Sequence, residues 1–167
     1  MSFLIGVVAR LDPIKGHDIF LRAARQFADK YHEAKFVIVG DGKTAYKDRL
    51  KVLANTIGLN DCLVWVDETD ELTGIYNALN IFTLTSQSES FPNTLCEAMA
   101  CGTPCVTSDV GDCRQIIGDS GIVVKSKDVS SLVSAWEVIY VGKDSINYSK
   151  PCQNAMSRIS SEYSLDR

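Results

Sequence analysis

Two cationic side chains follow the first apolar run of the chain and precede a helical pattern. They are Arg10 and Lys15, in the loop formed by residues 9–16. Arginine offers a planar fork of donors to phosphate oxygens, lysine supplies a point charge, and a helix N-terminus adds a partial positive charge. These residue types predict a site for a diphosphate group. The alternative is that Asp12 and Pro13 form a plain turn and that both cations are solvated.

Two carboxylates eight residues apart, Glu89 and Glu97, flank the start of another helical pattern. The unsatisfied N–H groups at such a helix start predict a second anion site. Glu97 also lies three residues after Thr94, a spacing that indicates a capping box in which Glu97 bonds back to the helix start. Glu89 could be an ordinary solvated acid of the loop. The spacing alone leaves these interpretations open.

Two further loops contain turn-forming glycines and little chemistry. They cover residues 40–42, which include Gly40, and residues 108–112. Glycine permits a close approach of the backbone to a ligand, but it is as well explained by the turn itself. The first loop of the chain lacks the Gly-x-Gly-x-x-Gly pattern that a dinucleotide-binding fold would place there.

Alternating apolar runs and amphipathic segments must position these loops. Strands are expected at residues 3–9, 35–40, 62–66, 80–85, 104–108 and 121–124. Helices are expected at about 16–31, 46–57, 72–79, 94–100 and 129–140, with Gly58 closing the second. Strands that are apolar without a period of two indicate a parallel sheet covered by helices on both faces. We predict one Rossmann-like, three-layer α/β/α domain over residues 1–167, with a mainly parallel six-stranded sheet.

Composition excludes several classes of protein. The 167 residues are 46% hydrophobic and 23% charged, as in an ordinary globular domain, and the formal net charge of −4 argues against a nucleic-acid partner. The apolar runs are too short to span a membrane. No Cys-x-x-Cys pair occurs among the six cysteines, so we expect reduced, buried thiols and no metal site.

Taken together, the loops resemble the C-terminal, nucleotide-sugar-binding half of retaining GT-B glycosyltransferases of family 4, the glycosyl transferases group 1. The resemblance runs in order over residues 4–141. It rests on four segments: residues 6–16, residues 37–42, residues 89–104 with Phe91-Pro92-Asn93 inside a Glu-x7-Glu motif, and Gly111 followed by residues 121–124. The chain departs from the family at Asp67 and Asp112, where glycine is common.

The resemblance implies a role for each matching residue. Arg10 and Lys15 would clamp the donor diphosphate and neutralise the leaving nucleoside diphosphate, and Glu89 would hold hydroxyls of the donor sugar. Glu97 would accept hydrogen bonds from the ribose. Catalytic roles thus fall to Arg10, Lys15 and Glu89. The implied substrate-binding residues are Arg10, Lys15, Gly40, Val66, Asp67, Glu89, Phe91, Pro92, Asn93, Thr94 and Glu97, with Val66 and Asp67 against the base and the N–H groups of Phe91, Asn93 and Thr94 toward sugar and phosphate.

The implied reaction is sugar transfer, with retention, from a UDP- or GDP-linked donor to a saccharide or lipid-linked acceptor, as in polysaccharide or lipopolysaccharide biosynthesis. It needs no cofactor beyond the nucleotide sugar and no metal. The acceptor would be bound by an N-terminal domain that this chain lacks, so the isolated domain is expected to be inactive. The resemblance implies a cytoplasmic enzyme, with room for peripheral membrane association of its full length.

Two alternatives come from other classes of function. One is a noncatalytic nucleotide- or phosphate-binding domain. The other is half of a sugar-nucleotide epimerase on the same architecture. An epimerase needs acid and base groups poised at a sugar carbon in a closed cleft, and no matching set of residues stands out in the sequence.

Overall fold

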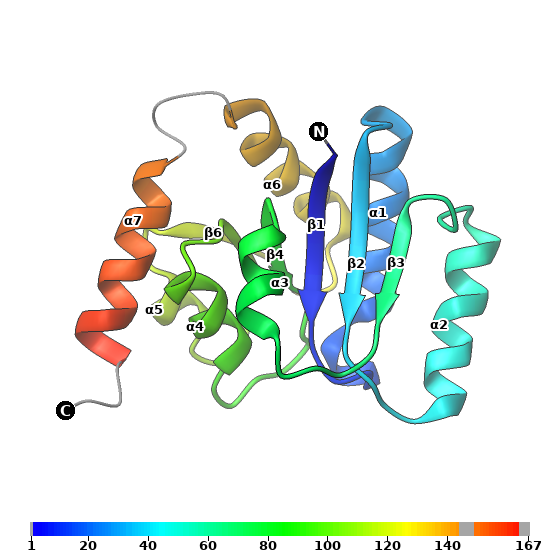
Figure 1. Cartoon of the computed structure of the whole chain (residues 1–167), viewed down its shortest axis with the longest axis horizontal. Coiled ribbons are helices and arrows are strands. Elements are labelled where there is room, and N and C mark those ends of the chain that lie inside the picture. The colour runs from blue at the N-terminus through cyan, green and yellow to red at the C-terminus, as the bar shows by residue number, and fades with distance from the viewer. Residues whose placement is uncertain (1, 144–148, 164–167) are drawn as a thin grey trace.

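The computed structural model of the chain describes residues 2–143 and 149–163, which form one six-stranded sheet with helices on both faces (Figure 1). The strands are β1 (Phe3–Val8), β2 (Ala34–Val39), β3 (Leu63–Val66), β4 (Ile81–Leu84), β5 (Cys105–Ser108) and β6 (Gly121–Val124). Their order is β3-β2-β1-β4-β5-β6, and every pair of neighbours is parallel. The predicted three-layer α/β class and all six predicted strands are confirmed.

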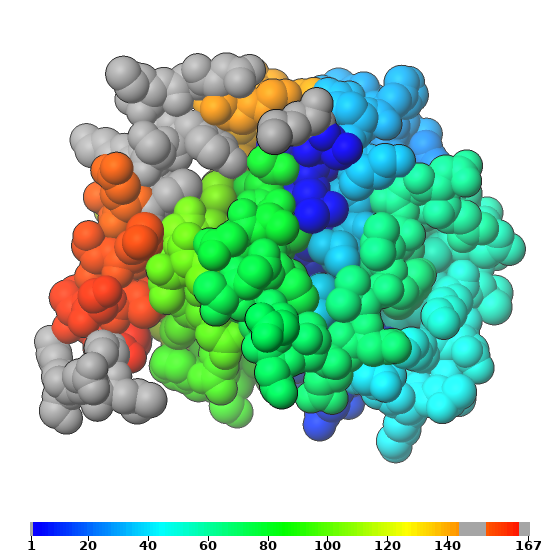
Figure 2. All heavy atoms as spheres, in the orientation of Figure 1, coloured from blue at the N-terminus to red at the C-terminus, as the bar shows by residue number. Residues whose placement is uncertain are grey.

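The helices divide between the two faces of the sheet. One face packs against α1 (His17–Lys30), α2 (Thr44–Thr56) and α6 (Val129–Gly142). The other packs against α3 (Leu72–Ala78), α4 (Asn93–Ala100), α5 (Cys113–Ile117) and α7 (Ser149–Arg158). In Figure 2, α3 lies over the middle of this second face, and α7 lies at its edge beside α4 and α5. A single 3-10 turn, η1 (Pro13–Lys15), precedes α1, and a π-helical segment, η2 (Ile159–Tyr163), follows α7.

Strand β1 shows why the apolar runs carry no period of two. Ile5 and Val7 pack into the core beneath α1, α2 and α6, whereas Leu4 and Val8 pack into the core on the opposite face. Both faces of the central strand are therefore buried, as expected of a parallel sheet covered on both sides. Cysteines 62, 96, 101, 105 and 113 form no disulfide, and Cys105 and Cys113 are buried.

Four local elements escape sequence reasoning, namely η1, α5, α7 and η2. The turn η1 and the helix α5 are too short, at three and five residues, to display a helical period. Helix α7 is polar, and among its residues with a described side chain only Ala155 is buried. None of the described helices is both long and apolar enough to cross a lipid bilayer.

The neighbouring strands β1 and β4 continue to opposite faces of the sheet. The chain leaves β1 for α1 on one face and leaves β4 for α4 on the other. In open parallel sheets, ligands bind beyond the carboxyl ends of the strands at the point where the connections diverge in this way. The two loops with the predicted cations and glutamates meet there.

Gly16 allows the loop of residues 9–16 to pack directly against the residue that follows β4. It has φ +66, and a Cβ built on it would lie 2.2 Å from the carbonyl oxygen of Thr85. The Thr85 hydroxyl donates to the carbonyl of Lys15 at 2.9 Å, and the backbone N–H of Gln87 donates to the carbonyl of Ile14 at 2.7 Å. This close backbone contact fixes the distance between the two loops and requires glycine.

Replacing Gly16 by alanine tests this constraint. Gly16→Ala should lower the free energy of unfolding by about 1–3 kcal/mol, because the left-handed conformation and the contact with Thr85 both oppose a Cβ. Gly74→Ala in α3 is the matched control, since no atom lies within 4 Å of its added Cβ. It should raise stability by about 0.5–1 kcal/mol through helix propensity. Urea unfolding checks both, and equal effects would contradict the constraint at Gly16.

Candidate functional site

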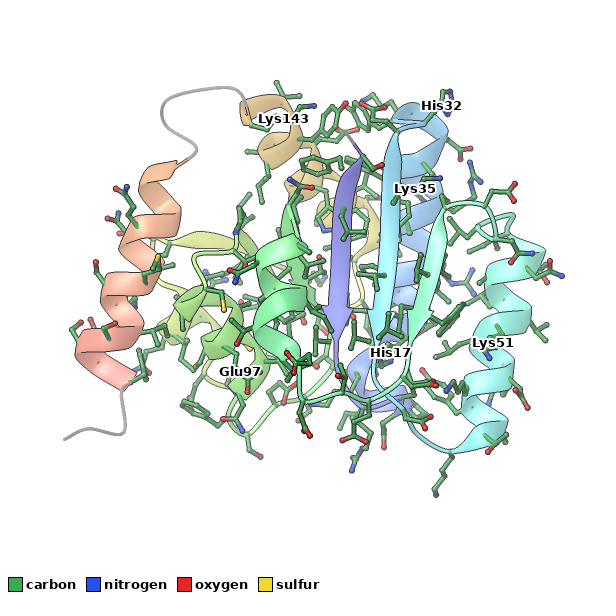
Figure 3. The ribbon with its side chains drawn as sticks, in the orientation of Figure 1. His17, His32, Lys35, Lys51, Glu97 and Lys143 are labelled. Carbon is green, nitrogen blue, oxygen red and sulfur yellow. The ribbon has the colours of Figure 1, made fainter. Side chains whose placement is uncertain are left out.

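A pocket of about 550 Å³ lies at the carboxyl edge of the sheet. Loops after β1, β2 and β3 and the start of α4 line it with Val8, Ala9, Arg10, Val39, Gly40, Asp41, Gly42, Glu68, Thr69, Asp70, Leu72 and Thr94. Of the residues predicted from sequence, Arg10, Gly40 and Thr94 are brought together here. Figure 3 shows Glu97 and His17 at this same end of the sheet, with His32 and Lys35 at the opposite end.

Arg10 is the accessible cation of the pocket. Its side chain is 71% exposed and lies 3.4 Å from the Asp12 carboxylate, a long and solvated ion pair. Asp12 itself caps η1, because its other carboxylate oxygen accepts the N–H of Ile14 at 3.0 Å. The plain turn expected at Asp12 and Pro13 is thus a capped 3-10 turn, which fixes the backbone of the loop. The guanidinium of Arg10 remains available to a ligand.

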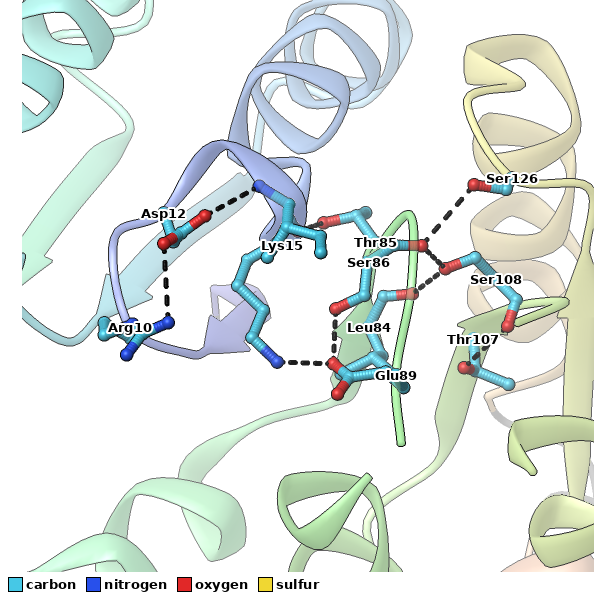
Figure 4. Close-up of polar contacts among 11 residues, drawn as sticks. Arg10, Asp12, Lys15, Leu84, Thr85, Ser86, Glu89, Thr107, Ser108 and Ser126 are labelled. Carbon is cyan, nitrogen blue, oxygen red and sulfur yellow. Dashed lines mark hydrogen bonds and ion pairs between the residues drawn. The ribbon is translucent and has the colours of Figure 1, made fainter. Parts of the chain in front are cut away.

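Lys15 and Glu89 form an ion pair across the two loops (Figure 4). The Lys15 ammonium donates to Glu89 Oε1 at 2.6 Å, and the Ser86 hydroxyl donates to the same oxygen, also at 2.6 Å. The side chain of Glu89 is only 8% exposed. The interpretations of Lys15 as a solvated cation and of Glu89 as a solvated loop acid are therefore wrong. The structure joins these two predicted residues, although neither lines the pocket around Arg10.

Glu97 is held by a tyrosine and does not take part in a capping box. Helix α4 begins at Asn93 with Pro92 as its N-cap and no side-chain cap, so Thr94 is already inside the helix. The Glu97 carboxylate accepts the hydroxyl of Tyr76 from α3 at 2.7 Å. Burial and the neighbouring Glu97 carboxylate raise the pKa of Tyr76, so this hydroxyl stays a donor.

The loop before α4 contributes fewer residues to the pocket than the sequence predicted. The N–H of Asn93 already donates to the carbonyl of Phe91 at 3.1 Å. The Phe91 ring is 47% exposed and lies 6.4 Å from the ring of Tyr163, whereas Pro92 is buried. Of this loop and the first residues of α4, only Thr94 lines the pocket.

After β3, the pocket is lined by residues further along the chain than Val66 and Asp67, the two that the sequence predicted. Val66 accepts the backbone N–H of Gly40 at 3.0 Å, and the Asp67 carboxylate accepts the ammonium of Lys47 at 2.7 Å. Lys47 also binds Asp41 at 3.1 Å, so it ties two loops together. The pocket is lined instead by Glu68, Thr69, Asp70 and Leu72.

The acids that precede α3 are loop residues. Helix α3 begins at Leu72 and has no acid in its first turn, so Asp67, Glu68 and Asp70 lie outside it. Glu68 and Asp70 could have been found from the rule that ligands bind beyond the carboxyl ends of strands. No group of three or more His, Cys, Asp or Glu side chains suited to a metal ion occurs in the described part of the chain.

Residues 2–140 match the family described as Glycosyl transferases group 1. The chain belongs to this family. Among the curated relatives, D-inositol 3-phosphate glycosyltransferase of Corynebacterium jeikeium (strain K411) is 32% identical over 141 residues, 79% of this chain and 34% of that protein. The lipopolysaccharide core biosynthesis mannosyltransferase LpcC of Rhizobium leguminosarum bv. viciae is 28% identical over 169 residues, 98% of this chain and 47% of that protein. The chain therefore spans a third to a half of these relatives.

Solved structures agree on the fold of this group 1 chain. Anabaena Alr3699/HepE in complex with UDP and glucose superposes with a TM-score of 0.84 at 22% identity, covering 95% of this chain and 44% of that one. The C-terminal domain of a group 1 protein, LpcC of Francisella tularensis, superposes with a TM-score of 0.86 at 24% identity, covering 98% and 87%. The predicted resemblance to a GT-B glycosyltransferase half is confirmed.

Sequence reasoning missed His17, which directly follows the loop formed by residues 9–16 of this group 1 domain. It is fully buried at the start of α1, with its ring 6.4 Å from that of Tyr46. Neither ring nitrogen meets hydrogen-bond geometry with another described residue. Burial lowers the pKa of His17 to about 4, against the smaller opposing effect of the backbone at Ala9 and Asp12. The folded protein therefore holds this ring neutral.

The buried ring makes stability depend on pH. Because the unfolded chain binds a proton at His17 near pH 6.5 and the folded chain only near pH 4, this contribution is complete above pH 6.5 and is lost as the pH falls to 4. Between pH 7 and pH 4 the free energy of unfolding should fall by about 3 kcal/mol from this group. Urea unfolding between pH 4 and 7 should show it. His17→Leu should flatten this part of the profile, whereas His32→Asn at an exposed site should not; equal slopes in all three proteins would refute it.

Proposed function

We propose that the chain is the nucleotide-sugar-binding domain of a retaining glycosyltransferase and the C-terminal half of a longer, two-domain enzyme. The carrying observation is the pocket at the divergence of β1 and β4, with the exposed Arg10 on one side and the start of α4 on the other. A cation and a helix N-terminus at this position suit a diphosphate. Membership of the group 1 family supports a glycosyl donor as the molecule that contains it.

In this proposal the described residues act mainly on the leaving group. Arg10 binds the diphosphate and stabilises the charge that develops on it as the glycosidic bond breaks. Glu97 accepts hydrogen bonds from the ribose hydroxyls, and the base lies against Glu68, Thr69 and Asp70, which line the pocket. Glu89 binds hydroxyls of the sugar, while Lys15 holds Glu89 and shares its charge with the phosphate. The pocket needs no metal ion for these roles.

The nucleotide and the acceptor follow from the relatives. UDP is the first candidate because HepE was solved with UDP and glucose, and GDP is the second. A saccharide or lipid-linked acceptor in polysaccharide or lipopolysaccharide assembly is supported by the LpcC relative. The acceptor would bind to the N-terminal half, so residues 1–167 should bind the nucleotide without transferring sugar. The complete enzyme would work in the cytoplasm, where it could associate peripherally with a membrane.

A ligand panel tests the proposal directly. Thermal unfolding of the 167-residue chain should shift upward with UDP-sugars or GDP-sugars, because a ligand that binds only the folded state stabilises it by mass action. Inorganic phosphate and pyrophosphate serve as controls for a plain anion site. A chain stabilised by pyrophosphate as strongly as by every nucleotide would be a phosphate-binding domain, and sugar turnover by this chain alone would contradict the division of labour.

Substitution of Arg10 tests the assignment of the site. Arg10→Ala should weaken UDP or GDP binding by roughly 10- to 100-fold, since it removes a charge-assisted hydrogen bond to phosphate. Glu97→Ala should weaken it to a similar extent through the ribose. Arg25→Ala is the control for lost charge, because Arg25 donates to the carbonyl of Gly58, ahead of β3 at the opposite edge of the sheet. Calorimetry measures all three, and unchanged affinity in both site variants would refute the assignment.

A further inference from the structure

Glu89 and Glu97 each have one carboxylate oxygen that accepts hydrogen bonds from other side chains. Glu89 uses Oε1 for Lys15 and Ser86. Glu97 uses Oε2 for the hydroxyl of Tyr76 at 2.7 Å, and its carboxylate has no hydrogen bond or ion pair with another described side chain. Glu97 is also an exposed residue. Its second oxygen, Oε1, is thus left to solvent or to a ligand.

Tyr76 is a rigid donor for this contact. The residue is 1% exposed, and its ring meets that of Phe82 edge-on at 5.7 Å. Its carbonyl accepts the hydroxyl of Thr103 at 2.8 Å, so its backbone is fixed as well. A side chain held in this way has little freedom to lose, whereas an unsupported glutamate would lose several rotamers on binding a ligand.

Tyr76 and Glu97 each lie one helical turn beyond a residue that lines the pocket. Leu72 in α3 and Thr94 in α4 line it. Tyr76 follows Leu72 by four residues and Glu97 follows Thr94 by three, so each lies on the same helix face as a pocket residue. Helices α3 and α4 pack against each other on one face of the sheet. The Tyr76–Glu97 bond therefore lies one helical turn beyond the residues that line this side of the pocket.

We propose that Tyr76 is a positioning residue for ribose recognition: it holds Glu97 Oε2, so that Oε1 accepts the ribose hydroxyls of the bound nucleotide. The proposal rests on the proposed function. Tyr76 does not touch the ligand; it acts through Glu97. A carboxylate that is already oriented binds a hydroxyl with less loss of entropy, so removal of the phenol should reduce selectivity for ribose.

The test compares a nucleotide with its form lacking the ribose hydroxyls. Calorimetry is run with UDP and GDP, and with the 2′,3′-dideoxy form of whichever binds more tightly. The natural sequence should prefer the ribonucleotide by about 10- to 100-fold, the range for hydrogen bonds to a charged group. Tyr76→Phe should reduce this preference by about tenfold and leave binding of the dideoxy nucleotide unchanged within about twofold, because the phosphate and base contacts persist.

The matched control is another tyrosine that donates to a glutamate. Tyr140 donates to Glu33, ahead of β2 at the opposite edge of the sheet. Tyr140→Phe should keep the full preference for ribose, so a general effect of losing a phenol–carboxylate bond is separated from an effect at the site. Thermal unfolding verifies that both variants are folded. Tyr76→Phe should fold, because the ring stays in place and water can reach the exposed Glu97.

A double-mutant cycle completes the test. If Tyr76 acts only through Glu97, then Tyr76→Phe should change the ribose preference no further in a Glu97→Gln background. A wild-type preference that survives Tyr76→Phe, or an additive effect with Glu97→Gln, would overturn the positioning role and leave the proposed function intact. Failure of the wild-type chain to bind either nucleotide would overturn both.

Discussion

The parallel pairing of β1 with β4 is the constraint on which the site depends. It places Ile5 beside Ile81 and Gly6 beside Phe82 in the middle of the sheet. A Cβ on Gly6 would lie 2.6 Å from the side chain of Leu79, so the residue that ends α3 packs closely on β1. Because the chain leaves the two strands toward opposite faces, α1 and α4 begin on opposite faces of the sheet at the carboxyl edge where the pocket lies. Residues far apart in sequence, such as Lys15 and Glu89, are brought together only by this pairing.

The sheet and its main helices could be predicted because their signals are local. Strands β1, β3 and β6 are apolar throughout apart from glycine, and α1 displays its core residues at steps of three and four. Gly58 ends α2 in the left-handed conformation that its position predicted. Two of the helices that escaped, α5 and α7, are short or polar and are stabilised by contacts that the local sequence does not display. Arg158 of α7, for example, donates to the carbonyls of Gln115 and Ile116.

The site was predictable in its residue types and less so in its contacts. Arg10, Lys15, Glu89 and Glu97 all lie at the edge where the loop positions placed them. Their partners could not be derived, because Tyr76 reaches Glu97 from a different helix and the spacing of Thr94 and Glu97 favoured a local bond instead. A local pattern of three residues cannot show that a tertiary donor competes for the same carboxylate. The structure resolves that competition in favour of the buried phenol.

The pairing of charges at this edge of the sheet explains how an acidic chain keeps one accessible cation, Arg10, at the pocket. Lys47 is neutralised by Asp41 and Asp67, and Lys15 by Glu89, which leaves Arg10 as the exposed cation on the pocket. Lysine has three donors, so Lys15 can keep Glu89 while it turns another N–H toward a phosphate oxygen. Lys15 could then contact a phosphate without breaking its ion pair with Glu89. The nearly buried Glu89 carboxylate would therefore keep its partner. In the proposed function, such sharing would couple the position of Glu89, as the acid that binds the sugar, to the charge of the leaving group.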